Sequence, residues 1–292
     1  MRVMVAGAGG QLGGAIMQRF SGPHDVLPLT RRELDVTREA DVARIVAAER
    51  PDVVINCTAF NDVDGAEDYA REAFEGNAFA VLALARAARE TSATFVHYGT
   101  DFVFDGLATA PYVEDDPARP ASVYGMSKLL GEWFAADAPA HYILRVESLF
   151  GGPRAKSSVD RIIDGIASGE PVRVFSDRTV TPSYVNDVAE ATARILDARP
   201  AAGLYHCVNS GTTTWHGLAE EVARVLDRVA HLQPVSVASV SMKARRPHYC
   251  ALSNRKLTDA GIPMPAWQDA LARYISARRK TDCPSSGAAH QR

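Results

Sequence analysis

The sequence contains only four cysteines, which lie far apart at positions 57, 207, 250 and 283. They form no C-x-x-C pair and no cluster with histidine at the spacing of metal ligands. We therefore expect reduced thiols and no bound metal. Long apolar runs are missing too: no stretch approaches the roughly 18 to 20 residues that span a bilayer, and the layout of a signal peptide is absent. We expect a soluble, cytoplasmic protein without a membrane partner.

The net charge is only −3, and the 32 basic residues form no stripe with interleaved aromatics. This pattern argues against nucleic acid as a partner. With 47% hydrophobic and 23% charged residues, the composition is that of an ordinary globular protein. The length of 292 residues allows one large or two modest domains.

The chain opens with a short apolar run over residues 2–6, followed by glycines at Gly7, Gly10 and Gly13 and then by a helical pattern. A strand, a glycine-rich turn and a helix form the entrance to a dinucleotide-binding unit. The glycines permit a tight turn and close approach of the pyrophosphate, and the helix N-terminus favours its negative charge.

A second predicted strand, residues 25–29, leads into Thr30, Arg31 and Arg32. An acidic residue at this point holds the ribose 2′-hydroxyl of NAD, whereas an arginine accommodates the 2′-phosphate of NADP. The arginines favour NADPH, with NADH as the alternative, although two solvated arginines in a loop would look the same. Further on, Thr37 is predicted to be the N-cap of the next helix.

Two more apolar runs predict strands at residues 53–56 and 94–98, with one long helix over residues 66–90 between them. The later strand is followed by Gly99, Thr100 and Asp101. If this fourth strand neighbours the first, Thr100 lies beside the nicotinamide, where its hydroxyl could bond a substrate carbonyl. A turn closed by the threonine hydroxyl is the alternative.

Tyr124 and Lys128 stand four residues apart on a predicted helix and therefore share one face. A neighbouring ammonium favours the phenolate and lowers the phenol pKa, so that Tyr124 can act as a general acid near neutral pH. Such a pair also occurs by chance, and its context has to support the interpretation.

That context is a set of separated motifs: residues 50–56 (R-P-D-V-V-I-N), 97–106 (H-Y-G-T-D-F-V-F-D-G) and 123–128 (V-Y-G-M-S-K). Together they resemble the dTDP-4-dehydrorhamnose reductase family, in the extended branch of the short-chain dehydrogenase/reductase superfamily. The resemblance reaches to about residue 278. It implies an α/β fold, a Rossmann-type doubly wound parallel sheet with a smaller C-terminal α/β substrate domain.

The resemblance also predicts how the chain is divided. Residues 1–150 would form an NADP-binding Rossmann domain, to which about 186–206 return. Residues 151–185 and 207–279 would form the substrate-binding domain. The tail 280–292 holds little apolar content, and we expect it to be disordered.

The activity that the resemblance implies is reduction of the 4-keto group of a nucleotide-linked 6-deoxysugar, with Thr100, Tyr124 and Lys128 as catalytic residues. The cofactor-binding residues would be Gly7, Gly10, Gln11, Leu12, Arg31, Asp35, Val36 and Ala59, together with Tyr124 and Lys128. The substrate-binding residues would be Thr100, Asp101, Arg178 and Arg246, where the arginines suit a diphosphate. Surface salt bridges are the alternative role of these arginines.

The chain departs from the family pattern where the sugar should bind. A serine usual beside the active threonine is Gly99, and residues 146–151 read V-E-S-L-F-G where typical members have T-S-W-x-Y-G. The segment thus lacks the tryptophan and contains Glu147 and Leu149. Two other functions stay open: a non-catalytic NADP-binding regulatory subunit, like the β subunit of methionine adenosyltransferase, and a sugar-nucleotide epimerase. The oligomeric state is not fixed by the sequence, and a homodimer stays open.

Overall fold

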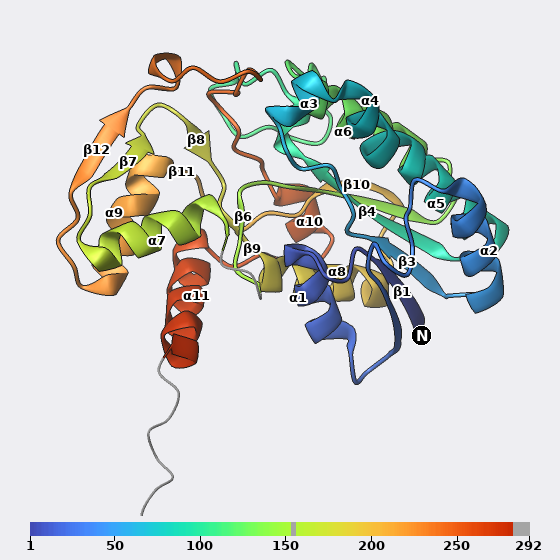
Figure 1. Ribbon diagram of the computed structural model, residues 1–292. Coiled ribbons are helices and arrows are strands. Elements are labelled where there is room, and N and C mark those ends of the chain that lie inside the picture. Colours follow the sequence, from blue (N-terminus) through green and yellow to red (C-terminus); the bar gives the residue numbers. More distant parts are fainter. Residues whose placement is uncertain (153–155, 283–292) are drawn as a thin grey trace, which may run out of the picture.

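The computed structural model describes residues 1–152 and 156–282, which form a larger lobe around a parallel sheet and a smaller lobe beside it (Figure 1). Six strands make up the sheet, in the order β10-β5-β4-β3-β1-β2, and every neighbouring pair is parallel. The strands are β1 (Arg2–Ala6), β2 (Asp25–Leu29), β3 (Val53–Asn56), β4 (Thr94–Thr100), β5 (His141–Val146) and β10 (Gly203–His206). The predicted Rossmann-type parallel sheet is confirmed.

The strand order changes direction at β1. The chain places β2 on one side of β1 and β3 on the other, and β4, β5 and β10 follow outward from β3. The fourth strand does not neighbour the first, because β3 lies between them, so the condition stated for Thr100 is not met. Ligands of open α/β sheets bind where the order reverses, at the carboxyl ends of the strands.

Helices cover both faces of the sheet, because side chains along each strand alternate between two apolar clusters. Val3 and Val5 of β1 belong to the cluster that includes residues of α1 (Gln11–Phe20) and α8 (Val185–Ala198). Met4 and Ala6 belong to the cluster of α2 (Glu39–Glu49) and α5 (Ala80–Glu90). Helix α6 (Val123–Ala135) packs beside α5 on that second face.

The long helix expected over residues 66–90 is broken. It consists of α3 (Gly65–Asp68), α4 (Ala70–Phe74), a π-helical turn η1 (Glu75–Phe79) and α5. The wider turn carries Asn77, which is buried and bonds the backbone N–H and carbonyl of Phe60 and the hydroxyl of Ser127. Asn77 therefore bonds a neighbouring loop and ties it to α6, a common use of such π turns near functional sites.

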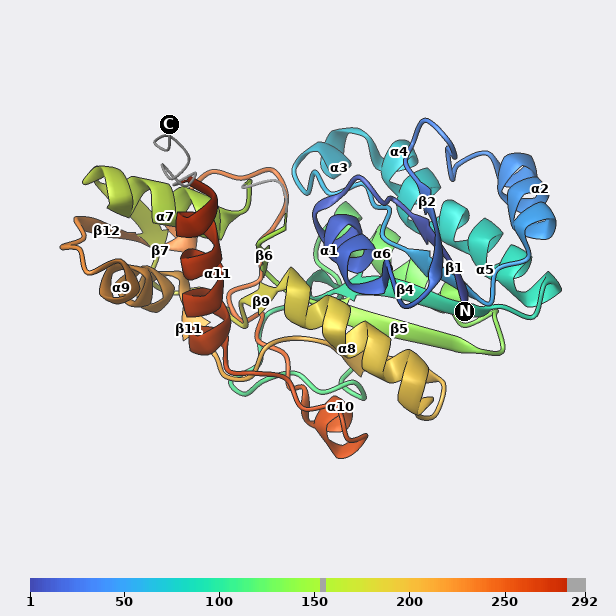
Figure 2. The ribbon, with the colours of Figure 1, turned by 90° about the horizontal axis from the view of Figure 1, so that it is seen from below.

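The smaller lobe consists of helices around a two-stranded parallel sheet, seen from another side in Figure 2. Its main elements are α7 (Ser158–Ser168), β7 (Val172–Phe175), α9 (Trp215–Leu226), β12 (Leu232–Val235) and α11 (Trp267–Asp282). The remaining short elements are η2 (Asp101–Val103), β6 (Leu149–Phe150), β8 (Thr179–Val180), β9 (Ser183–Tyr184), β11 (Thr213–Thr214), η3 (Val237–Ser239) and α10 (Arg255–Asp259).

Helix α11 runs to Asp282 and so enters the tail that was expected to be disordered from residue 280. Arg279 and Lys280 stand in its last turn, where positive charge favours the helix, and Arg279 donates to the Leu226 carbonyl. The rest of the expected tail, 283–292, lies outside the described residues. Within the described part of the chain, no helix has the length and apolar character needed to cross a membrane.

Candidate active site

A pocket of about 740 Å³ opens at the carboxyl ends of β1, β2 and β3, where the strand order reverses. Its wall includes the glycine turn after β1, the turn after β2 and the segment after β3. Six of the predicted cofactor residues line it: Gly7, Gly10, Arg31, Asp35, Val36 and Ala59.

The glycine turn has no room for larger residues. Gly7 has a φ of +81°, and a Cβ there would lie 2.9 Å from the Cys57 carbonyl carbon. A Cβ at Gly13 would lie 2.1 Å from the Gly7 oxygen. Because these glycines have no Cβ, the start of α1 can lie close to the end of β1. The N-cap residue Gly10 provides no side-chain cap, so the first amides of the helix are available for an anion.

Gln11 and Leu12 are placed differently from the other predicted cofactor residues. The Gln11 side chain donates to the Gly151 carbonyl over 2.9 Å, and the Leu12 side chain is buried in the core. Neither side chain lines the pocket, so a role in cofactor binding would fall to their backbone amides at the N-terminus of α1.

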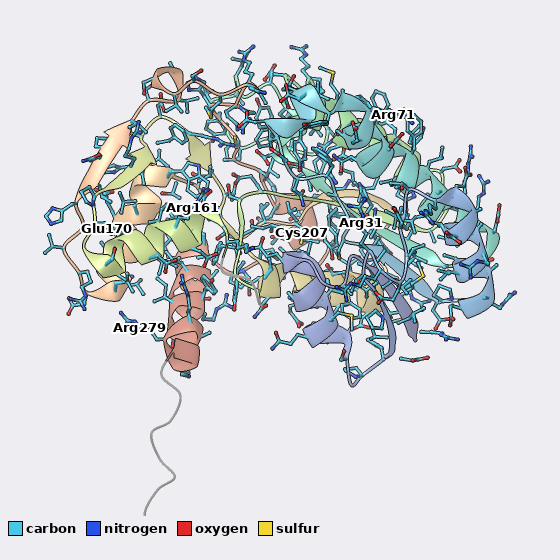
Figure 3. All side chains as sticks on the ribbon, viewed as in Figure 1. Arg31, Arg71, Arg161, Glu170, Cys207 and Arg279 are labelled. Carbon is cyan, nitrogen blue, oxygen red and sulfur yellow. The ribbon has the colours of Figure 1, made fainter. Side chains whose placement is uncertain are left out.

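The turn after β2 exposes Arg31 and Arg32, which both line the pocket. Arg31 is labelled in Figure 3. The carboxylate of Glu33 is engaged within the turn and forms no salt bridge in the described structure, because it accepts hydrogen bonds from the backbone N–H and hydroxyl of Thr30. These bonds lower the pKa of Glu33. The arginines are therefore the free charges of this turn.

The carboxylate of Asp35, which follows in the same wall, accepts from the backbone N–H and the hydroxyl of Thr37, and these bonds lower its pKa. Helix α2 begins only at Glu39, with Arg38 as its N-cap. The prediction that Thr37 caps this helix is therefore wrong. Its hydroxyl is used by Asp35 in a local side-chain turn instead.

Thr100 and Tyr124 meet at the end of β4. Ser122 caps α6 by accepting from the Gly125 amide over 3.1 Å, which sets Tyr124 in the first turn of the helix. A Cβ at Gly125 would lie 2.3 Å from the Phe102 oxygen, so glycine lets the helix approach the segment after β4. The Thr100 hydroxyl lies next to the Tyr124 phenol and lowers its pKa, and Tyr124 is only 8% exposed.

Lys128 lies one turn further along α6 and is buried. Its ammonium donates to the Tyr98 carbonyl over 2.6 Å, and burial lowers its pKa to about 8. The pKa of Tyr124 is raised, first by burial and then by the charge of Asp101. The prediction that Lys128 lowers the phenol pKa is therefore wrong for this arrangement, because removal of the phenol from water outweighs other effects.

The two predicted substrate arginines lie against one aromatic ring. The guanidinium carbons of Arg178 and Arg246 are 5.5 Å and 5.8 Å from the centroid of Phe102, within the range of a cation–π contact. Arg246 also donates to the carboxylate of Asp64 over 2.9 Å. Arg178 is mostly buried and donates to the Cys250 sulfur over 3.5 Å. Neither arginine therefore serves only in a surface salt bridge.

Sequence reasoning missed a second pocket, of about 330 Å³, between α7, β7 and the start of α9. Arg178 lines it together with Arg161, Arg173, Phe175 and Trp215. Figure 3 shows Arg161 on α7 in the smaller lobe. The only local signal is that Phe175 and Arg178 stand close together after a strand, and the other residues come from distant parts of the chain.

The packing around residue 99 explains why this residue is glycine. A Cβ at this position would lie 2.2 Å from the Glu132 carboxylate and 3.0 Å from Cγ of Arg145. These two side chains form a buried ion pair with a separation of 2.8 Å. The space that a serine would take beside Thr100 is therefore filled by the pair.

A doubly wound parallel sheet, a glycine turn at the dinucleotide pocket and a Thr-Tyr-Lys set define an extended short-chain dehydrogenase/reductase. The family model described as RmlD substrate binding domain matches residues 1–280. A dTDP-4-dehydrorhamnose reductase of Mycobacterium tuberculosis is 37% identical over 288 residues, covering 94% of this chain and 93% of that protein. The chain belongs to the dTDP-4-dehydrorhamnose reductase family.

Two further relatives bear on the site. A probable dTDP-4,6-dihydroxy-2-methyloxan-3-one 4-ketoreductase of Streptomyces antibioticus is 35% identical over 276 residues, covering 93% of each chain. The crystal structure of a dTDP-4-dehydrorhamnose reductase of Bacillus anthracis in complex with NADP matches with a TM-score of 0.90 and 29% identity. The match covers 94% of this chain and 99% of that chain.

Proposed function

We propose that this protein reduces the 4-keto group of a nucleotide-linked 6-deoxysugar with NADPH, and that dTDP-4-dehydrorhamnose is its substrate. The observation that carries the proposal is the placement of the Thr100 and Tyr124 hydroxyls next to each other at the end of β4, beside the dinucleotide pocket. The relative in Mycobacterium tuberculosis, which bears the name of this activity, supports it.

The pocket fits a dinucleotide on its own geometry. Gly7 and Gly13 let the turn pack closely against the backbone of Cys57 and the end of β1, and the N-terminus of α1 offers amides without a side-chain cap. Gly10 and the backbone of Gln11 and Leu12 would hold the pyrophosphate. Ala59 and Val36 would line the nucleoside half of the site.

The charges at the rim support NADPH over NADH. The two acidic residues of the segment after β2 are engaged locally, Glu33 by Thr30 and Asp35 by Thr37. A free carboxylate is what holds the 2′-hydroxyl of NAD, whereas Arg31 is exposed and can pair with a 2′-phosphate.

The chemical step needs a proton donor beside the reacting carbonyl. A bound nicotinamide supplies the hydride to the keto carbon. Tyr124 gives its proton to the carbonyl oxygen, and the Thr100 hydroxyl donates a hydrogen bond to the same oxygen as negative charge develops there. The Lys128 ammonium donates to Tyr98 with one of its protons, and the others can hold the ribose hydroxyls.

The smaller lobe supplies the substrate side of the site, in line with a division into nucleotide- and substrate-binding domains. Arg178 stands at both the Phe102 ring and the second pocket, so it can bind the diphosphate that joins the sugar to its nucleoside. Arg246 lies at the same ring. Trp215 and Phe175 in the second pocket offer aromatic surface for the nucleoside.

The test is nicotinamide absorbance after mixing the protein with NADPH and freshly generated dTDP-4-dehydrorhamnose. NADH and the unepimerised 4-keto-6-deoxyglucose precursor serve as comparisons. Rapid oxidation with dTDP-4-dehydrorhamnose establishes the reductase. Binding of NADPH without oxidation by either sugar contradicts the proposal and favours a regulatory subunit, for which a partner pull-down follows.

A further inference from the structure

Three side chains that the proposed reduction does not use meet next to the proton donor. Asp101, Glu147 and Cys250 each bring one oxygen or sulfur to within 4.8 Å of the others, and all three residues are buried. The Arg178 guanidinium reaches the same cluster through the Cys250 sulfur. These residues come from the ends of β4 and β5, the segment before β8 and the segment after η3.

The hydrogen bonds of the cluster leave one carboxylate oxygen free. Glu147 accepts from the Ser148 hydroxyl and the Thr181 amide, so both of its oxygens are engaged. Asp101 accepts from Thr100 with one oxygen, whereas its Oδ2 is buried without a partner. The Nε of Arg178 is likewise buried without a partner. A buried, unpaired carboxylate oxygen is costly unless it carries a proton.

The balance of charges in the cluster also indicates that one carboxyl group carries a proton. Two carboxylates face a single guanidinium, and the Cys250 thiol stays neutral because burial raises its pKa. Burial and the charge of the other carboxylate raise the pKa of Glu147 to about 8, and burial raises that of Asp101. Two carboxylates this close titrate as a pair, so one proton stays on them at neutral pH.

One hydroxyl lies between this pair and the reacting centre. The Thr100 hydroxyl donates to Oδ1 of Asp101 over 3.1 Å, and it also lies next to the Tyr124 phenol, whose pKa it lowers. The other charged group of this region, Lys128, is bonded to the Tyr98 carbonyl.

We propose that the Asp101 and Glu147 carboxyls hold a shared proton and pass it through the Thr100 hydroxyl to Tyr124 after each reduction. The inference rests on the proposed function. When Tyr124 has given its proton to the product alkoxide, the phenolate takes the proton of Thr100, and Thr100 takes one from the carboxyl pair. The pair is left with two negative charges, and it recovers a proton from water once the product has left. The net uptake is one proton per turnover, which is the proton that the reduction consumes.

The residue that makes the pair is Glu147, which stands where typical members of the family have serine. In its absence Asp101 would face Arg178 alone and would be ionised at neutral pH, since an opposite charge favours the carboxylate. Glu147 thus acts through Asp101 and Thr100 and not on the substrate.

The experiment compares the pH profile of kcat for the full-length wild type, Glu147→Gln and a control, Glu114→Gln. The control makes the same replacement at a carboxylate that accepts from the His206 amide outside the site. In the wild type and the control we expect kcat to fall as pH rises through about 8, because the pair loses its proton there. In Glu147→Gln we expect kcat at pH 7 to drop at least about tenfold. Lys128, whose pKa burial lowers to about 8, titrates in all three proteins, so the rates are compared at pH 7 and below. A Glu147→Gln enzyme that keeps the kcat of the control between pH 6 and pH 7 overturns the proposal.

A second measurement does not depend on turnover. The infrared band of a protonated carboxyl should be present in the substrate-free wild type at pH 7 and should vanish between pH 7 and 9. It should be missing from Glu147→Gln. Its absence from the wild type at pH 7 overturns the shared proton, even where Glu147→Gln does not fold. A band that is present in a protein that oxidises NADPH with neither sugar would instead reject the proposed function alone.

Discussion

The rings of Phe102 and Tyr124 pack edge to face, with centroids 5.5 Å apart and an angle of 86° between their planes. The guanidinium groups of Arg178 and Arg246 also lie over the Phe102 ring. One aromatic side chain therefore joins the proposed proton donor to both proposed diphosphate ligands. A shift of this ring would move the proton donor and the substrate arginines together.

Tyr124→Phe removes the proton donor and little else. We expect kcat to fall by about 10² to 10⁴, because this is what a positioned general acid contributes, while the Kd for NADPH changes less than about threefold. Stopped-flow absorbance and fluorescence titration measure the two. Tyr69→Phe, at a residue 57% exposed, is the matched control and should keep its activity. A Tyr124→Phe enzyme with a near-normal rate would refute the assigned role.

Arg31→Ala should weaken the binding of NADPH far more than that of NADH, because only NADPH has a 2′-phosphate, which loses its arginine partner in this variant. A charge-assisted hydrogen bond of about 1.5 to 3 kcal/mol corresponds to about 10-fold to 100-fold in the Kd. Calorimetric titration with both cofactors provides the comparison. The control is Arg44→Ala, at an exposed arginine paired with Asp41 on α2. Equal losses for both cofactors would place the 2′-phosphate contact elsewhere.

Gly99→Ala should destabilise the fold by about 1 to 3 kcal/mol, because the new Cβ overpacks against the buried Glu132–Arg145 pair. Urea denaturation followed by circular dichroism measures the free energy of unfolding. Gly9→Ala is the control, since its Cβ would meet its nearest atom only at 3.6 Å. If Gly99→Ala is as stable as the control, the ion pair does not set this position.

Lys128→Met should stabilise the cofactor-free protein at pH 7, by about 1 to 3 kcal/mol, because the folded state no longer holds a buried ammonium. The folded pKa of about 8 lies below the ordinary value, so the lysine costs stability below pH 8. That cost disappears as pH rises toward the unfolded pKa of about 10.4, since the unfolded state then releases its proton too.

The advantage of Lys128→Met should therefore shrink at pH 10. Chemical denaturation of both proteins at pH 7 and pH 10 tests this dependence. A variant that is less stable than the wild type at pH 7 would show that the bond to Tyr98 outweighs the burial of the charge.

The sheet and much of the site could be predicted because the signals are local. A strand followed by Gly7, Gly10 and Gly13 is typical of a turn that binds a dinucleotide. The spacing of Tyr124 and Lys128 places both side chains on one face of their helix. The strand order could not be predicted, because the position of β3 beside β1 depends on which side of the sheet each crossover takes. The break at Asn77 depends in turn on partners far away in the sequence, Phe60 and Ser127.

The electrostatics of the site were the least predictable part. Sequence spacing suggested that Lys128 lowers the pKa of Tyr124, but burial of both groups decides the direction. Glu147 stood out only as a departure from the family pattern. Its meaning depends on Asp101, Arg178 and Cys250, which come together only in three dimensions.

The central claim is tested most directly by the initial rate of NADPH oxidation with dTDP-4-dehydrorhamnose, measured for the wild type and for Tyr124→Phe in parallel. We predict rapid oxidation by the wild type and a loss of about 10² or more in the variant, at unchanged NADPH affinity. Equal rates for the two proteins, or no oxidation by a wild type that binds NADPH, would contradict the proposed reductase.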